Sequence, residues 1–111
     1  MADTGLIQRE WIYELLPQQA RVRCRYKRHA RRILEFTVQL EIHNQEIWQP
    51  VVRFDNAHGF CHRDDLHPDG RQDKTAVFVG DPNETFTRAI DEIQTHWETH
   101  RNRFLREIKA P

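Results

Sequence analysis

The chain has 111 residues, with 17 basic and 17 acidic side chains, so its formal net charge at neutral pH is zero. A chain of this length forms one domain, and we expect residues 1–111 to fold as a single unit. A neutral protein has no overall field to draw it to nucleic acid or to a membrane. Its two cysteines, the lack of a secretion signal in MADTGLIQREW and the lack of a run of about 20 apolar residues predict a cytoplasmic protein with reduced thiols and no membrane contact.

The first segment of the chain is ambiguous, and the two segments after it are predicted strands. Residues 6–16 fit a helix or a strand, because their apolar positions match both periods. Residues 20–27 alternate strictly between apolar and basic side chains, which predicts a strand with one buried face. Residues 33–43 repeat this pattern. A turn near residues 29–31 would place Val22 opposite Val38, Cys24 opposite Phe36 and Arg25 opposite Glu35.

A third strand is predicted at residues 47–55, with Trp48, Val52 and Phe54 on the buried face and Val51 on the other. Pro50 has no amide proton, which indicates a sheet edge or a bulge within this strand. Residues 75–79 form the most apolar run of the chain and predict a short fourth strand.

A long helix is predicted from Pro82 onward. Asp81 is placed to cap it and Glu84 completes a capping box, while apolar residues then follow one face for about seven turns. The predicted fold class is therefore α+β, an antiparallel sheet of about four strands packed by a long C-terminal helix. The predicted core consists of Phe36, Val38, Leu40, Val52, Phe54, Ile90, Ile93 and Trp97.

Between the third and fourth strands, residues 53–70 (RFDNAHGFCHRDDLHPDG) contain few apolar residues and are predicted to be a surface loop. A pair of histidines can act as general base and general acid, and an arginine can stabilise charge on a phosphate. Arg53, Arg63, His58, His62 and His67 would supply a metal-independent site for RNA cleavage. Alternatively the loop is structural, and its histidines bind backbone groups at turns.

Metal binding is a further alternative for this loop. Imidazole and thiolate are ligands that zinc accepts, and His58, Cys61, His62 and His67 are the natural set. Their spacing matches no standard zinc module, and the adjacent Cys61 and His62 would diverge on an extended strand.

A basic strip occupies residues 21–32, which hold seven of the 17 basic residues. Arg21, Arg23 and Arg25 would either neutralise glutamates of the neighbouring strand or, with Arg63, bind the phosphates of RNA. The sequence leaves both readings open.

The run DNAHGFCHRDDLHPDG, with the strand before it and the helix after it, resembles a family of short bacterial and archaeal proteins of unknown function. More distantly, RFDNAH followed by clustered histidines resembles the TumE-like toxins of toxin–antitoxin pairs. This second resemblance implies a site at Arg53, Asp55, Asn56, His58 and His62, and a small antitoxin-like protein as partner. The chain departs from the TumE-like pattern after His58, where Gly59-Phe60-Cys61 replaces a segment with proline.

Two functions of different classes follow. One is an RNA-directed, metal-independent nuclease or toxin-like protein. The other is a non-enzymatic interaction module, or a homodimer, whose loop is structural and whose helix or second sheet face binds a partner. A small core with a heavily charged surface favours a homodimer. The sequence alone does not decide whether the protein is an enzyme.

Overall fold

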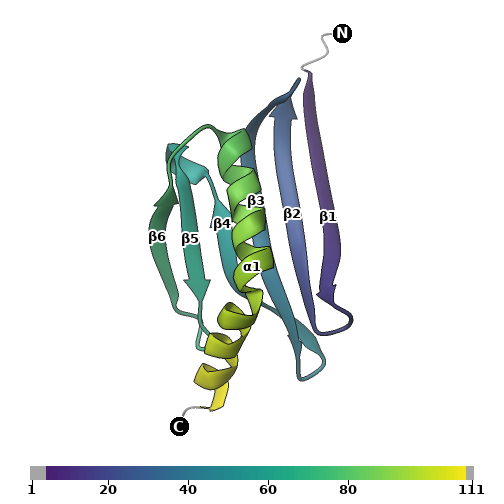
Figure 1. Cartoon of the computed structure of the whole chain (residues 1–111), viewed down its shortest axis with the longest axis vertical. Helices are drawn as coiled ribbons and strands as arrows, with labels where there is room; N and C mark the ends of the chain where they lie inside the picture. Colours follow the sequence, from purple (N-terminus) through teal and green to yellow (C-terminus); the bar gives the residue numbers. More distant parts are fainter. Residues whose placement is uncertain (1–4, 110–111) are drawn as a thin grey trace.

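The computed structural model describes residues 5–109, apart from the side chain of His58. One antiparallel sheet of six strands is crossed on one face by a single long helix (Figure 1). The strands follow the chain in order, each pairing with the next. They are β1 (Leu6–Leu16), β2 (Ala20–His29), β3 (Arg32–Asn44), β4 (Ile47–Asp55), β5 (Cys61–Leu66) and β6 (Gln72–Phe78). The helix is α1 (Pro82–Lys109), and a short 3-10 turn, η1 (Ala57–Gly59), joins β4 to β5.

The predicted fold class is confirmed, but the sheet has six strands instead of about four. One extra strand is β1, which settles the ambiguous periodicity of its segment. The other is β5, which lies within the predicted loop. Pairing with β4 on one side and β6 on the other makes β5 a strand despite its charged sequence CHRDDL. Tertiary context here overrides local strand propensity.

The predicted register between β2 and β3 was wrong by two residues. Cys24 lies opposite Val38 and Val22 opposite Leu40, whereas Arg25 lies opposite Thr37. The hairpin turns at Ala30, whose φ is +51°, and a bulge follows Lys27. A shift of two residues keeps each side chain on its face, so the two apolar faces still coincide.

A bulge in β4 corrects two predictions. Leu40 pairs with Val52 but Glu41 pairs with Pro50, so Val51 is the extra residue. Val51 and Val52 are both fully buried, although Val51 was expected on the opposite face. The bulge turns Trp48 away from the core, and the Arg21 guanidinium lies 4.0 Å from the centre of its ring.

The helix begins as predicted. The Asp81 carboxylate accepts hydrogen bonds from the amides of Asn83 (2.8 Å) and Glu84 (3.3 Å). The Asn83 side chain accepts the amide of Ile33 at 2.9 Å and donates to the Arg31 carbonyl oxygen at 2.8 Å, which ties the start of α1 to the β2–β3 hairpin.

The helix packs chiefly on β3 and also on β4 and β5. Six of the eight predicted core residues are buried. Ile90 and Trp97 are only half-buried, because they lie on the flank of α1 that faces the partly covered edge strand β1. That flank is marked by Phe86, which contacts Trp11 of β1, and by Gln94, which hydrogen-bonds to the Tyr13 hydroxyl.

Candidate functional site

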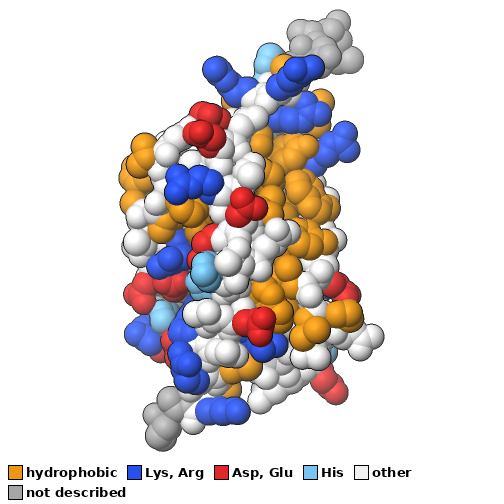
Figure 2. All heavy atoms as spheres, in the orientation of Figure 1, with side chains coloured by type: hydrophobic (Ala, Val, Ile, Leu, Met, Phe, Trp, Pro, Cys, Tyr) orange, Lys and Arg blue, Asp and Glu red, His pale blue; other side chains and the backbone are white. Residues whose placement is uncertain are grey.

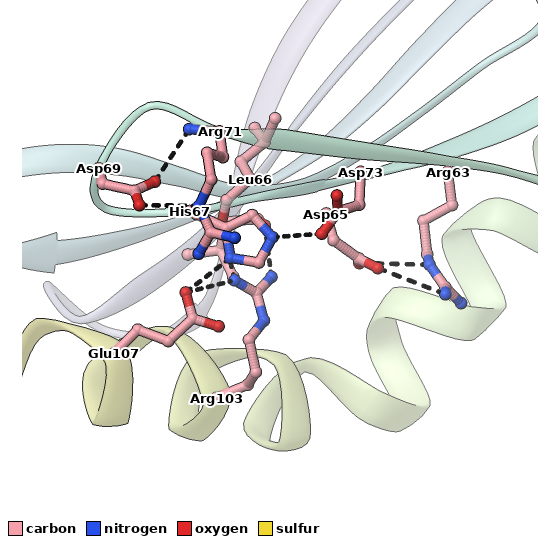
Figure 3. Close-up of polar contacts among 10 residues, drawn as sticks. Arg63, Asp65, Leu66, His67, Asp69, Arg71, Asp73, Arg103 and Glu107 are labelled. Carbon is pink, nitrogen blue, oxygen red and sulfur yellow. Dashed lines mark hydrogen bonds and ion pairs between the residues drawn. The ribbon is translucent and has the colours of Figure 1, made fainter. Parts of the chain in front are cut away.

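The predicted catalytic residues lie on both faces of the sheet. Because residues 61–66 form β5, alternate side chains of this segment point in opposite directions. His62 lies opposite Asp55 of β4, and Asp64 lies opposite Arg53. These four residues share the face away from α1, which we call the polar face. Arg63 and His67 lie on the helix side (Figure 3).

On the polar face, Arg53, Asp55 and His62 form a compact group. Arg53 donates from Nε to Gln39 at 2.8 Å, and the Asp55 carboxylate accepts the amide of Ala57 at 3.0 Å. His62 is only 8% exposed, and its ring lies 4.5 Å from that of Phe60. Three of the predicted catalytic side chains are therefore neighbours.

The side chain of His58 lies outside what the structure describes. Its backbone belongs to η1, directly after Asp55 and Asn56. Asn56 holds this segment against β3, because its side chain accepts the amide of Phe36 at 2.8 Å and donates to the Leu34 carbonyl oxygen at 3.0 Å. The segment that the resemblance marked is thus fixed to the sheet by a side-chain amide.

His67 belongs to a separate cluster on the helix side. Its Nδ1 lies 2.7 Å from a carboxylate oxygen of Glu107, and its Nε2 lies 2.7 Å from one of Asp73. Two carboxylates at the two ring nitrogens favour the imidazolium, which can donate to both. The hydrogen bonds with Glu107 and Asp73 raise the pKa of His67 above its ordinary value of 6.5. Figure 3 shows the ring held between the helix and β6.

Arg103 extends this cluster to the strands. Its guanidinium donates to the carbonyl oxygens of Leu66 (2.7 Å) and Val51 (2.9 Å), and it lies 3.6 Å from Glu107. Val51 is the bulge residue of β4, so Arg103 satisfies a carbonyl at the point where the ladder is interrupted. The cluster therefore fastens the last turns of α1 to β4 and to the end of β5.

A hollow of about 230 Å³ opens beside this cluster. Among its lining residues are Arg53, His67, Arg71, Gln72 and Phe104. Two of its three cations already have carboxylate partners, since His67 lies between Glu107 and Asp73, and Arg71 is 2.8 Å from Asp69. The hollow thus has little uncompensated charge with which to attract an anion.

Of the four residues proposed as zinc ligands, the three whose side chains are described do not come together. Cys61 is fully buried in the core, whereas His62 points to the polar face and His67 lies on the helix side. Burial raises the pKa of the Cys61 thiol to about 12, so it stays protonated at neutral pH. Among the side chains of residues 5–109 other than His58, no group of three or more histidine, cysteine or acidic residues is arranged to hold a metal ion.

Part of the basic strip pairs with glutamates of the neighbouring strand. Glu41 lies 2.7 Å from Arg21 and 3.0 Å from Arg23. Burial alone would raise the pKa of Glu41, but hydrogen bonds from Arg23, Arg21 and Gln39 outweigh burial and lower it. Arg25 pairs with Glu35 at 3.5 Å on the same face.

Arg63, the fourth residue expected to bind nucleic acid, points to the helix side, where it pairs with Asp65 at 3.2 Å. The four arginines of the predicted phosphate-binding set therefore do not share a face. A single RNA strand lying flat on the sheet would not reach all of them.

A second surface of interest is apolar and lies beside α1. The helix covers the inner face of β1 only in part, whereas Val22 and Cys24 on the inner face of β2 are fully buried. Hydrophobic side chains gather beside the helix over this edge of the sheet (Figure 2). All of them are half-buried and pack on the edge of the core. We call this surface the open apolar face, formed by Trp11, Tyr13, Leu15, Tyr26, Ile90 and Trp97.

Aromatic contacts hold the upper part of this face in place. The ring of Tyr26 lies edge-on to Trp11 at 5.5 Å and to Phe86 at 5.8 Å, and Phe86 in turn contacts Phe36 of the core at 5.3 Å. These separations suit favourable edge-to-face packing. The surface is therefore attached to the core by ring contacts.

Comparison with known families gives one match. The model of a domain of unknown function, DUF7718, matches residues 6–110, almost the whole chain. The chain belongs to this family. No curated protein and no solved structure matches it.

The side-chain clusters of this DUF7718 domain could be predicted only in part from its sequence. Arg103 and Glu107 are four residues apart on one side of a helix, but their partners Leu66 and His67 lie 37 and 40 residues away. The i,i+4 spacing was the only local signal, and no nearby residues indicated the partners.

Within residues 5–109 of the domain, no helix has the length and apolar character needed to span a membrane.

Proposed function

We propose that this protein is a non-enzymatic interaction module that binds a protein partner through its open apolar face. The observation that supports this most directly is the group of half-buried Trp and Tyr side chains beside α1. A continuous apolar patch rimmed by polar residues usually marks an interaction site on a soluble domain.

The composition of the face supports the same function. Trp11, Tyr13, Tyr26 and Trp97 are of the residue types that contribute most to binding energy at protein interfaces. The edge-to-face contacts of Trp11 and Tyr26 limit the side-chain entropy that binding would otherwise cost. A polar rim is also present, because Gln94 of α1 binds the Tyr13 hydroxyl at 3.1 Å.

A photo-crosslinking amino acid placed at Trp97 tests this function in the cells that produce the protein. Thr95 is the matched control, since it is exposed on the same helix but points away from Trp97. We expect covalent adducts from position 97 and far fewer from position 95. The mass of the adduct tells a second copy of the chain from a different protein. Equal yields at the two positions would show that the open apolar face is not a binding surface.

A second candidate function is RNA cleavage on the polar face, as a metal-independent nuclease or toxin-like protein with an antitoxin-like partner. It is favoured by the placement of Arg53, Asp55 and His62 as neighbours on one face, with His62 directly opposite Asp55. A histidine next to a carboxylate is suited to general base catalysis, and an arginine nearby to stabilising a phosphate.

An RNA cleavage assay with and without a chelator tests this candidate. His62→Ala should remove activity, whereas His67→Gln, on the opposite face, should leave it unchanged. Cleavage that survives His62→Ala would reject the polar-face site. No cleavage by the unaltered protein would reject the nuclease function and leave the interaction module unaffected.

A further inference from the structure

The first strand, β1, lies at an edge of the sheet. It pairs with β2 on one side, and within residues 5–109 no strand lies on its other side. At 11 residues it is longer than the opposite edge strand β6, which has 7. Its side chains Ile7 and Ile12 are 37% and 44% exposed. A long edge strand with exposed apolar residues is a template for pairing with another strand.

Two copies of β1 can pair antiparallel about a two-fold axis only in certain registers. Residues opposite each other must have their side chains on the same face of the sheet. The sum of their residue numbers is therefore even, and neighbouring registers differ by two in this sum. With Trp11 on the axis, Arg9 lies opposite Tyr13, Glu10 opposite Ile12 and Gln8 opposite Glu14. No like charges face each other in this register.

The neighbouring registers are unfavourable. If the pair is centred on Glu10, this residue lies opposite Glu10 of the other copy. If the pair is centred on Ile12, Glu10 lies opposite Glu14. Like charges directly opposite each other destabilise a pair of strands. Registers shifted further pair fewer residues of β1, so among the three registers with the most paired residues the charges select the one centred on Trp11.

We propose that the partner of the open apolar face is a second copy of this chain, joined by antiparallel pairing of the two β1 strands with Trp11 on the two-fold axis. This inference rests on the proposed function, because it names the partner of that face. Pairing extends each sheet to twelve strands and joins the two open apolar faces into one, with the two Trp11 side chains in contact at the centre. The interface is self-complementary, as two-fold symmetry requires.

A matched pair of substitutions at Gln8 tests the register. Gln8 is exposed, and in the proposed dimer it faces Glu14 twice, once at each end of the paired strands. Gln8→Lys should strengthen the dimer and Gln8→Glu should weaken it, each changing the dissociation constant about 2- to 30-fold in sedimentation equilibrium. Within one chain Gln8 lies opposite Lys27. This pairing is present in monomer and dimer alike, so it does not change which of the two variants should have the lower dissociation constant.

The double variant Gln8→Glu with Glu14→Lys restores opposite charges across the axis and should recover the affinity lost by Gln8→Glu alone. Equal dissociation constants for Gln8→Lys and Gln8→Glu would overturn the Trp11-centred register. A purified chain that stays monomeric at every concentration would overturn the homodimer. In either case an adduct at Trp97 with a different protein would leave the proposed function standing, whereas the absence of adducts would reject that function separately.

Discussion

The two halves of the sheet have similar sequence patterns but differ in how deeply their apolar faces are buried. Both β2 and β3 alternate apolar and charged residues and present one apolar face toward the helix side. On β3 and β4 this face is covered by α1, and Phe36, Val38, Val52 and Phe54 are almost completely buried. On β1 the corresponding residues Trp11, Tyr13 and Leu15 are only partly buried.

This difference in burial arises because the sheet is wider than the helix that packs on it. Strands lie about 4.8 Å apart, so six of them span about 24 Å. A helix with its side chains is about 10–12 Å across and covers roughly half of that. Having one helix, the chain fills the uncovered strip with aromatic rings that pack on the flank of α1. The open half is thus a surface with core-like composition, which suits a partner.

The largest expected effect contrasts these halves directly. Phe36→Ala removes a ring that is 1% exposed and should lower the free energy of unfolding by about 3–5 kcal/mol. Trp11→Ala removes a larger side chain from the open half and should cost less, about 1–2 kcal/mol, because less of the side chain leaves water on folding. Urea unfolding of a dilute sample measures both. Equal losses would contradict the division into covered and open halves.

The sequence was a good guide wherever periodicity was strict. The strands β2 and β3, the capped start of α1 at Asp81 and the bulge indicated by Pro50 all rest on local patterns that the structure keeps. The register of β2 with β3 was missed because it depends on a turn at Ala30 and a bulge after Lys27. Neither the turn nor the bulge contains a residue such as glycine that would indicate it in the sequence.

The candidate site was less predictable because it depends on faces. Reading residues 53–70 as a loop allowed His62 and His67 to converge, but β5 separates them onto opposite sides of the sheet. The charges of CHRDDL concealed a strand whose pairing is decided by its neighbours β4 and β6. Arg103 was missed because its partners are backbone carbonyl oxygens of Leu66 and Val51, 37 and 52 residues away, and that of Val51 lies at a bulge.

A second, smaller effect concerns how the covered half is fastened. Arg103→Lys keeps the charge but cannot reach both carbonyl oxygens, of Val51 and Leu66, as the guanidinium does. We expect a loss of about 1–2 kcal/mol, because a buried carbonyl loses its donor. Arg106→Lys is the control, since Arg106 is exposed on the same part of α1.

Hydrogen exchange measures which part of the sheet is destabilised by Arg103→Lys. Amides near the bulge in β4 should exchange faster in Arg103→Lys, whereas those of β1 and β2 should be unchanged. Faster exchange in the open half would mean that the two halves of the sheet unfold together and that the contrast between them is one of exposure only.

The smallest expected effect is a pH dependence of the covered half. The pKa of His67 is raised in the folded state by Glu107 and Asp73, relative to 6.5 in the unfolded chain. A raised folded-state pKa means that the imidazolium stabilises the fold fully below about pH 6.5, and that this stabilisation disappears as the pH rises through the folded-state value. The contribution should be about 1 kcal/mol or less, as is usual for ion pairs near the surface.

The measurement compares the unaltered protein with His67→Gln across pH 5.5 to 9. The difference in unfolding free energy should be largest at the acidic end and shrink steadily toward the alkaline end. His96→Gln, at an exposed position of α1, is the matched control for the same substitution outside the cluster. A difference that stays constant with pH would mean that His67 holds α1 to β6 through neutral hydrogen bonds and packing, and that its two carboxylates do not act as counterions. If the trend is found, protonation of one side chain tightens the covered half through contacts that include none of the residues of the open apolar face.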